Sequence, residues 1–135
     1  MRPGCSGVRL LLDTNAFLWW LAGDEALSVA ARTAIADNGS EVFVSAASAW
    51  EITTKHRLGK LSRVAAIVAD LDAAIVDQSF IGLPVSVRHG QVGGALPGPH
   101  RDPFDRMLIA QATADNLVLV SNEQIFDAYG VGRLW

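Results

Sequence analysis

Acidic side chains stand where short apolar runs give way to helix-like sequence. Asp13 directly follows a run of leucines, and Glu51 and Asp105 lie early in segments with helical patterns. Asp102 and Glu123 occupy similar junctions. Carboxylates gathered in one partly buried cleft repel one another and become protonated unless a cation neutralises them. Mg²⁺ and Mn²⁺ prefer oxygen ligands and assist displacement at phosphorus, so these acids predict a divalent-metal site for phosphoryl chemistry.

Each acid taken alone also fits a structural role, because acids at helix starts cap backbone N–H groups and oppose the helix dipole. Glu51 can pair with Lys55 one turn later, and Asp102 precedes an N1 proline as a cap would. Asp105 favours function, because apolar residues at positions three, four and seven further on place it on the face that packs against the sheet. Asp13 ends a strand expected to be central, where an unpaired buried carboxylate is costly.

Apolar runs alternate with helical patterns along the whole chain, which indicates a βα rhythm and a mostly parallel sheet of four to five strands covered on both faces. The expected strands are 8–12, 42–44, 80–83, 117–120 and 131–135. The expected helices are 14–21, 29–37, 46–57, 63–77, 87–95, 103–114 and 123–129. The carboxyl ends of parallel strands share one edge of a sheet, where such folds place their sites. The acids are therefore expected to meet there.

Length and composition limit the classes of protein that fit. The 135 residues suffice for one domain, expected over 8–135 after a flexible leader at 1–7. The one cysteine, Cys5, is expected to be a free thiol, and no apolar stretch is long enough to span a membrane, so we expect a cytoplasmic protein. A net charge of −3 requires any contact with nucleic acid to be local. Motifs for binding dinucleotides, nucleotide phosphates or zinc are missing from the sequence.

Four ordered motifs in the sequence resemble one known family. They are LLDTN at 11–15, SAASAWEI at 45–52, GKL at 59–61 and HRDPFDR at 100–106. Together they resemble PIN-domain ribonucleases of the VapC toxin type. The resemblance implies an α/β/α sandwich, RNA cleavage that depends on Mg²⁺ or Mn²⁺, and a cognate antitoxin protein as partner. It also implies a homodimer, or a heterotetramer or larger assembly with the antitoxin.

The resemblance also assigns roles to individual residues. The acids that match its metal-binding positions are Asp13, Glu51, Asp105 and, within the D-P-x-D-R segment, Asp102. Thr14 and Asn15 match small polar residues that support the first acid. Glu123 departs from the pattern, because relatives commonly carry aspartate there. The longer side chain either reaches the metal or caps the following helix.

The remaining expectations concern surfaces that bind RNA and a partner. Local basic residues expected to hold the RNA backbone are Lys55, Arg57, Lys60 and Arg106. His100 is a weaker candidate for a phosphate contact. The helices at 14–21, with Phe17, Trp19 and Trp20, and at 63–77 offer apolar anchors for a partner peptide, unless these side chains fill the core.

Two other functions compete with the ribonuclease. A haloacid-dehalogenase-like phosphatase would use Asp13 as nucleophile, but its D-x-D pattern fails because Asn15 stands two positions on. A non-catalytic PIN-like module would bind RNA or a protein without cleaving it. Retention of the acids disfavours this alternative without excluding it.

Overall fold

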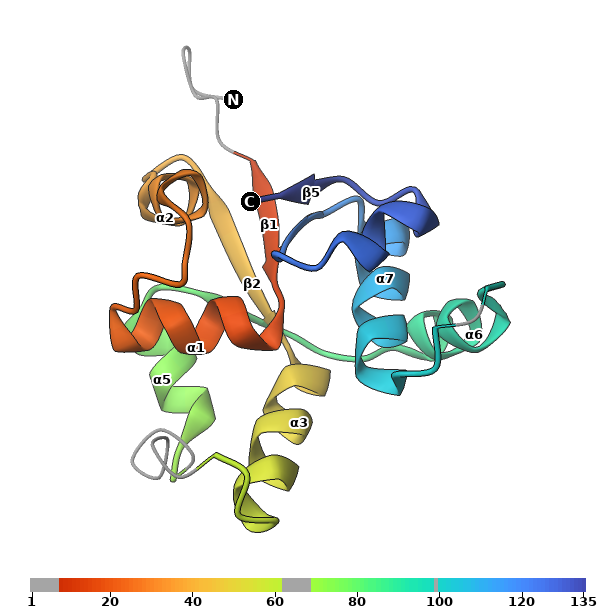
Figure 1. The fold of residues 1–135 in the computed structure, drawn as a ribbon, viewed down its shortest axis with the longest axis horizontal. Coiled ribbons are helices and arrows are strands. Elements are labelled where there is room, and N and C mark those ends of the chain that lie inside the picture. The colour runs from red at the N-terminus through yellow and green to blue at the C-terminus, as the bar shows by residue number, and fades with distance from the viewer. Residues whose placement is uncertain (1–7, 62–68, 99) are drawn as a thin grey trace.

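A parallel sheet runs through the centre of the computed structural model, which describes residues 8–61, 69–98 and 100–135 (Figure 1). The strands are β1 (Arg9–Leu12), β2 (Glu41–Ser45), β3 (Ile81–Leu83), β4 (Val118–Val120) and β5 (Arg133–Leu134). Their order across the sheet is β3-β2-β1-β4-β5, and every neighbouring pair is parallel. The predicted α/β class and parallel sheet are thereby confirmed.

Helices cover the sheet on both faces. They are α1 (Thr14–Ala22), α2 (Val29–Ala36), α3 (Ala46–Arg57), α5 (Leu71–Asp77), α6 (Val87–Ala95) and α7 (Pro103–Asp115), with a 3-10 helix, η2 (Gln124–Tyr129). The polar residue before each of the first two helices caps it: Asp13 accepts from the Ala16 N–H and Ser28 from the Ala31 N–H. These caps satisfy backbone donors that a helix start leaves free.

Two apolar cores lie on opposite faces of the sheet. Leu10 and Leu12 of β1 point into a core shared with α1, α2, α3 and α5, where Phe17 is completely buried. Leu11 points the other way, into a core built by α7 and by Phe126 of η2. Alternate residues of one strand therefore serve both layers, which explains why β1 reads as uninterrupted leucine.

The structure corrects three expectations. Helix α5 begins only at Leu71, after a turn at 69–70 in which Asp70 caps it, so the predicted helix 63–77 is not continuous; residues 62–68 lie outside the described part. The segment after Glu123 is a 3-10 helix and not an α-helix. Phe17 fills the core and offers no anchor to a partner. The leader at 1–7 also lies outside the described residues.

Candidate active site

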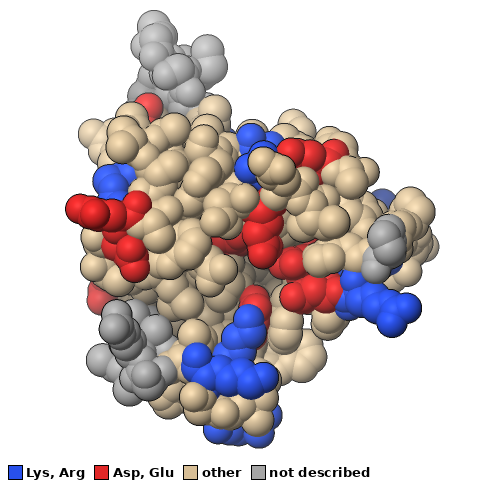
Figure 2. Space-filling view, viewed as in Figure 1, with Lys and Arg blue, Asp and Glu red and all other residues tan. Residues whose placement is uncertain are grey.

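An acidic pocket opens at the carboxyl ends of β1, β2 and β4. Its walls are Asp13, Thr14, Asn15, Glu51, Lys55, Asp102, Asp105 and Glu123, around a cavity of about 100 Å³. In the space-filling view the carboxylates gather in a hollow at the centre of one face, with basic side chains directly below them (Figure 2). The predicted acids are therefore brought together from four separate stretches of chain.

Asp13 occupies the junction between the central strand and α1. Its side chain is almost fully buried and accepts a hydrogen bond of 2.7 Å from the Ala16 N–H. Burial raises the pKa of Asp13 to about 6, although hydrogen bonds from Ser121 and Ala16 lower it in part. The negative charges of Glu123 and Asp105 raise the pKa further. The folded protein therefore loses stability when the Asp13 carboxylate is ionised.

Glu51 enters the pocket from the first half of α3, where it is buried. The Thr14 hydroxyl donates to Glu51 Oε1 over 2.6 Å, and Lys55 Nζ donates to Oε2 over 2.5 Å. Ser45, at the end of β2, caps α3. Each oxygen of Glu51 therefore has a donor of its own, which fixes the orientation of the carboxylate.

The two acids of α7 have different roles at its start. Asp102 is the N-cap and accepts from the N–H groups of Phe104 and Asp105. Asp105, one turn in, is partly buried, and burial raises its pKa to about 6. A hydrogen bond from His100 acts against this increase in pKa. Asp102 therefore has the structural role that its position before proline predicts, while also lining the pocket.

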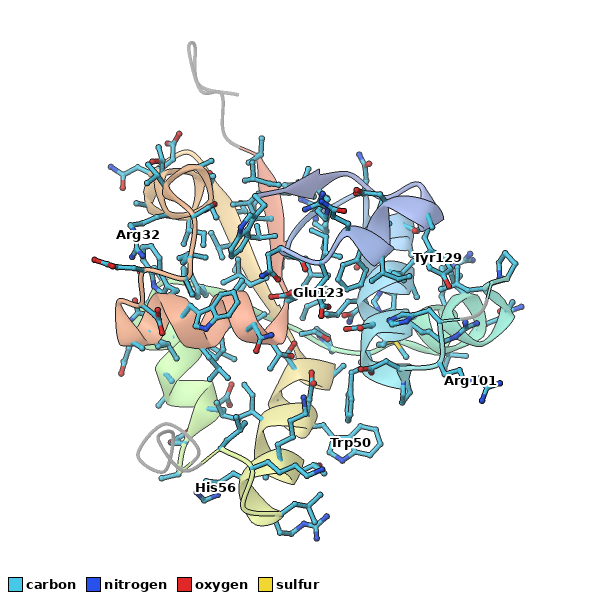
Figure 3. All side chains as sticks on the ribbon, in the orientation of Figure 1. Arg32, Trp50, His56, Arg101, Glu123 and Tyr129 are labelled. Carbon is cyan, nitrogen blue, oxygen red and sulfur yellow. The ribbon has the colours of Figure 1, made fainter. Side chains whose placement is uncertain are left out.

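Glu123 enters the acidic pocket from the segment after β4, and it lies at the centre of the side-chain view (Figure 3). The sequence left open whether this glutamate caps the next helix. Glu123 precedes η2 but makes no side-chain capping bond, while its own N–H donates to the Ser121 hydroxyl over 3.0 Å. The carboxylate is therefore available to the pocket.

The donor chemistry fits a hard divalent cation, because the pocket supplies carboxylate oxygens and two of the acids have a pKa raised by burial. Among the described residues, no three acidic, histidine or cysteine side chains are already arranged as a metal site. Two of the carboxylates are held by neighbouring donors, Glu51 by Thr14 and Lys55, and Asp105 by His100. The composition of the pocket therefore suits a hard divalent cation.

Of the predicted basic residues, Lys55 lines the pocket, where its bond to Glu51 raises its pKa. Arg57 and Lys60 are exposed at and beyond the end of α3. Arg106 has another role: its guanidinium donates to the carbonyl oxygens of Gly93, Leu96 and His100. These bonds direct three of its donors into the protein, and the contact of Arg106 with RNA stays a prediction.

Sequence reasoning missed two contributors to the site. His100 was considered only as a phosphate contact, yet its Nε2 lies 2.8 Å from Asp105 Oδ2. Ser121 received no role from the sequence, yet it is completely buried and its hydrogen bond lowers the pKa of Asp13. The spacing of His100 five residues before Asp105 was the only available signal, and it does not fix the direction of a loop side chain.

Comparison with known proteins identifies the class of this fold and site. The PIN domain family matches residues 10–132, and the chain therefore belongs to the PIN domain family. Ribonuclease VapC22 of Mycobacterium tuberculosis is 27% identical over 117 residues, which cover 85% of this chain and 87% of that protein.

Solved structures agree on the fold. VapBC2 from Rickettsia felis, bound to a DNA fragment from its promoter, superposes with a TM-score of 0.68 at 16% identity, covering 93% of this chain and 97% of that one. VapC20 of Mycobacterium tuberculosis, a toxin that cleaves the sarcin-ricin loop, gives 0.61 at 17% identity, covering 90% and 95%. At these identities the likeness concerns the architecture.

None of the described helices is long and apolar enough to cross a membrane.

We predict that Asp13→Asn stabilises the metal-free protein at pH 7. Since the pKa of Asp13 rises from 3.8 to about 6 on folding, the folded chain holds the proton more tightly, and its stability increases as the pH falls through about 6. The amide still caps α1 but removes the buried charge. We expect a gain of roughly 1–3 kcal/mol in the free energy of unfolding at pH 7, shrinking toward about pH 4.

Urea unfolding in chelator-treated buffer at several pH values measures this gain, with Asp37→Asn as the control on an exposed acid. A gain for Asp13→Asn that is independent of pH, or one equalled by the control, would contradict burial as the source of the raised pKa.

Proposed function

We propose that this chain is a divalent-metal-dependent endoribonuclease that hydrolyses phosphodiester bonds of RNA in the cytoplasm. The observation that carries the proposal is the convergence of the acids on one pocket at the carboxyl edge of a PIN domain. Ribonuclease VapC22, with 27% identity, supports RNA as the substrate.

Asp13, Glu51 and Asp105 are the residues we propose for holding Mg²⁺ or Mn²⁺, with Asp102 and Glu123 at the margin of the site. When bound, the ion supplies a Lewis acid that activates water and stabilises charge developing at phosphorus. Thr14 and Asn15 lie in the pocket wall beside Asp13; Thr14 orients Glu51 through its hydrogen bond, and Asn15 is exposed to solvent at the entrance.

Lys55, Arg57 and Lys60 are proposed to bind the RNA backbone. They follow Glu51 along α3 and the turn after it. Helix α3 lies below the centre of Figure 1, in the region where Figure 2 shows basic side chains beneath the acidic hollow. A chain with a net charge of −3 attracts a polyanion only through such a local concentration of cations. Lys55 already contacts the Glu51 carboxylate, so it lies at the boundary between the acidic pocket and the basic residues that follow it.

The biological role we propose is that of the toxin in a toxin–antitoxin pair, inhibited by a cognate antitoxin. Support comes from relatives described as VapBC assemblies, from Rickettsia felis and from Salmonella typhimurium, the latter with a TM-score of 0.65 at 16% identity and coverage of 93% of this chain and 96% of that one. A homodimer, or a heterotetramer or larger assembly with the antitoxin, is proposed on the same ground.

An apolar surface beside the site supports such assembly. It is formed by side chains of α3 and α7 and of the segment before α6, namely Ala46, Ala47, Trp50, Val85, Pro103, Phe104 and Met107. Trp50 is 69% exposed, meets Phe104 edge-on at 5.5 Å, and points away from α3 in Figure 3. An exposed tryptophan packed on a half-buried phenylalanine, within an apolar patch, is typical of an interaction surface.

The alternatives lose ground for different reasons. Membership in the PIN domain family does not favour a phosphatase that uses Asp13 as nucleophile, and no observation of the site supports that role. A non-catalytic PIN-like module would not need a buried carboxylate with a pKa raised to about 6, which lowers stability unless a ligand neutralises it. Cleavage assays separate these functions.

We predict that Asp13→Asn and Asp105→Asn abolish RNA cleavage while the fold is retained, because each removes a charge that the cation requires and keeps the side-chain shape. Purified protein, freed of any partner, is incubated with total RNA and added Mg²⁺ or Mn²⁺, and products are followed on gels. The loss should be at least about 100-fold. Circular dichroism of each variant checks the fold, and cleavage by either at the wild-type rate would refute the carboxylate site.

We predict that neutralising Lys55, Arg57 and Lys60 together weakens RNA binding and flattens its dependence on salt, because each phosphate contact releases counterions. Binding to the cleavage-deficient Asp13→Asn background is measured by fluorescence anisotropy from low to moderate salt. Neutralising Arg9 and Arg32, two arginines on other elements, is the control. An unchanged slope in the triple variant would assign the three residues to ordinary surface solvation.

We predict that a small DNA-binding protein encoded beside this gene forms a stable complex with the chain and suppresses cleavage. Co-expression and co-purification, followed by light scattering on the chain and on the complex, report the partner and the size of both assemblies. A complex that forms but cleaves RNA at the rate of the free chain would contradict inhibition. Failure to form any complex would point to a stand-alone RNA-processing nuclease.

A further inference from the structure

His100 reaches Asp105 from the loop between α6 and α7. Its Nε2 lies 2.8 Å from Asp105 Oδ2, and the two side chains are 21% and 17% exposed. When Nε2 carries the proton, His100 donates a hydrogen bond to the Asp105 carboxylate, which burial would otherwise leave poorly solvated. His100 does not line the acidic pocket itself, so it acts on the site through Asp105.

Arg106 fixes the loop that carries His100. Its Nε donates to the Gly93 carbonyl over 3.1 Å and its Nη1 to the His100 carbonyl over 3.0 Å, while Nη2 donates to Leu96. One planar guanidinium therefore holds together Gly93 in the last turn of α6, Leu96 at its end, and His100. Because the geometry of this fork is rigid, it fixes the relative positions of these three carbonyl groups in a way that a lysine would not.

These contacts form a closed ring. The chain runs from Asp105 directly to Arg106, across the hydrogen bond to the His100 carbonyl, and back through the imidazole to Asp105 Oδ2. The Asp102 cap holds the first turn of α7, on which both Asp105 and Arg106 lie. A side chain held in such a ring has few rotamers to lose when it takes a ligand.

We propose that His100 and Arg106 are positioning residues that hold the Asp105 carboxylate in the orientation required to bind the divalent cation. The inference rests on the proposed function, since it concerns the same acidic site. Groups that hydrogen-bond to a metal-binding side chain orient it and contribute to metal affinity without touching the ion. The interpretation also accounts for the burial of the Arg106 donors in carbonyl contacts, which a role in binding RNA does not.

The test is the affinity of the full chain for Mn²⁺, measured by titration calorimetry without RNA. His100→Ala should weaken Mn²⁺ binding by about 10-fold or more, whereas His100→Gln, whose amide can replace Nε2, should retain most of the affinity. His56→Ala is the matched control, because His56 lies on α3 away from this ring (Figure 3). Thermal melts exclude loss of the fold as the cause.

Arg106→Lys keeps the charge but loses the fork. It should weaken Mn²⁺ binding as His100→Ala does, and the double variant should be little weaker than either single one, because both changes break the same ring. Wild-type Mn²⁺ affinity in His100→Ala, or additive losses in the double variant, would overturn the proposal while leaving the nuclease intact. Wild-type protein that binds Mn²⁺ but cleaves no RNA would instead refute the proposed function alone. Absence of Mn²⁺ binding by the wild type would overturn both.

Discussion

Negative charge concentrated at one edge of a buried sheet is the constraint on which the rest of this structure depends. Asp13 and Asp105 lie where water is largely excluded, and their raised pKa values measure the cost. Folding must supply that free energy from the apolar cores on either side of the sheet. Hydrogen bonds from Ser121 and the Ala16 N–H to Asp13, and from His100 to Asp105, reduce the cost without removing it. The residual cost is what makes a divalent cation a favourable ligand.

The strand order explains why these acids meet at all. Because β1 lies in the middle of the sheet, its end is flanked by the ends of β2 and β4, and the segments that follow all three strands open onto one edge. Parallel pairing aligns those ends, with Leu12 opposite Val44 on one side and Val120 on the other. Ser121, one residue past β4, is therefore close enough to form a hydrogen bond with Asp13. The helix α7, packed over the second core, brings Asp105 from the remaining side.

Much of this arrangement could be predicted from the sequence, for local reasons. The leucine run before Asp13 indicates a central strand, and the spacing of apolar residues after Asp105 indicates a helix that faces the sheet. The actual partners of the acids could not be predicted, because they depend on side chains from separate elements meeting at hydrogen-bond distance. Arg106 shows the difference: its charge suggested RNA, whereas three carbonyl groups, from the end of α6 and the segment after it, determine where it points.

Lys55 shows how the same site can serve two opposite charges. Its ammonium group is paired with Glu51 and remains 44% exposed in the wall of the pocket. A divalent cation that takes over the neutralisation of Glu51 would leave Lys55 free to contact a phosphate. An approaching RNA strand would favour this transfer of Lys55 from Glu51 to a phosphate. Its negative phosphates offer a partner both to the divalent cation and to the Lys55 ammonium. The acidic pocket and the basic surface are thus coupled through one residue, so binding of metal and of RNA should reinforce each other.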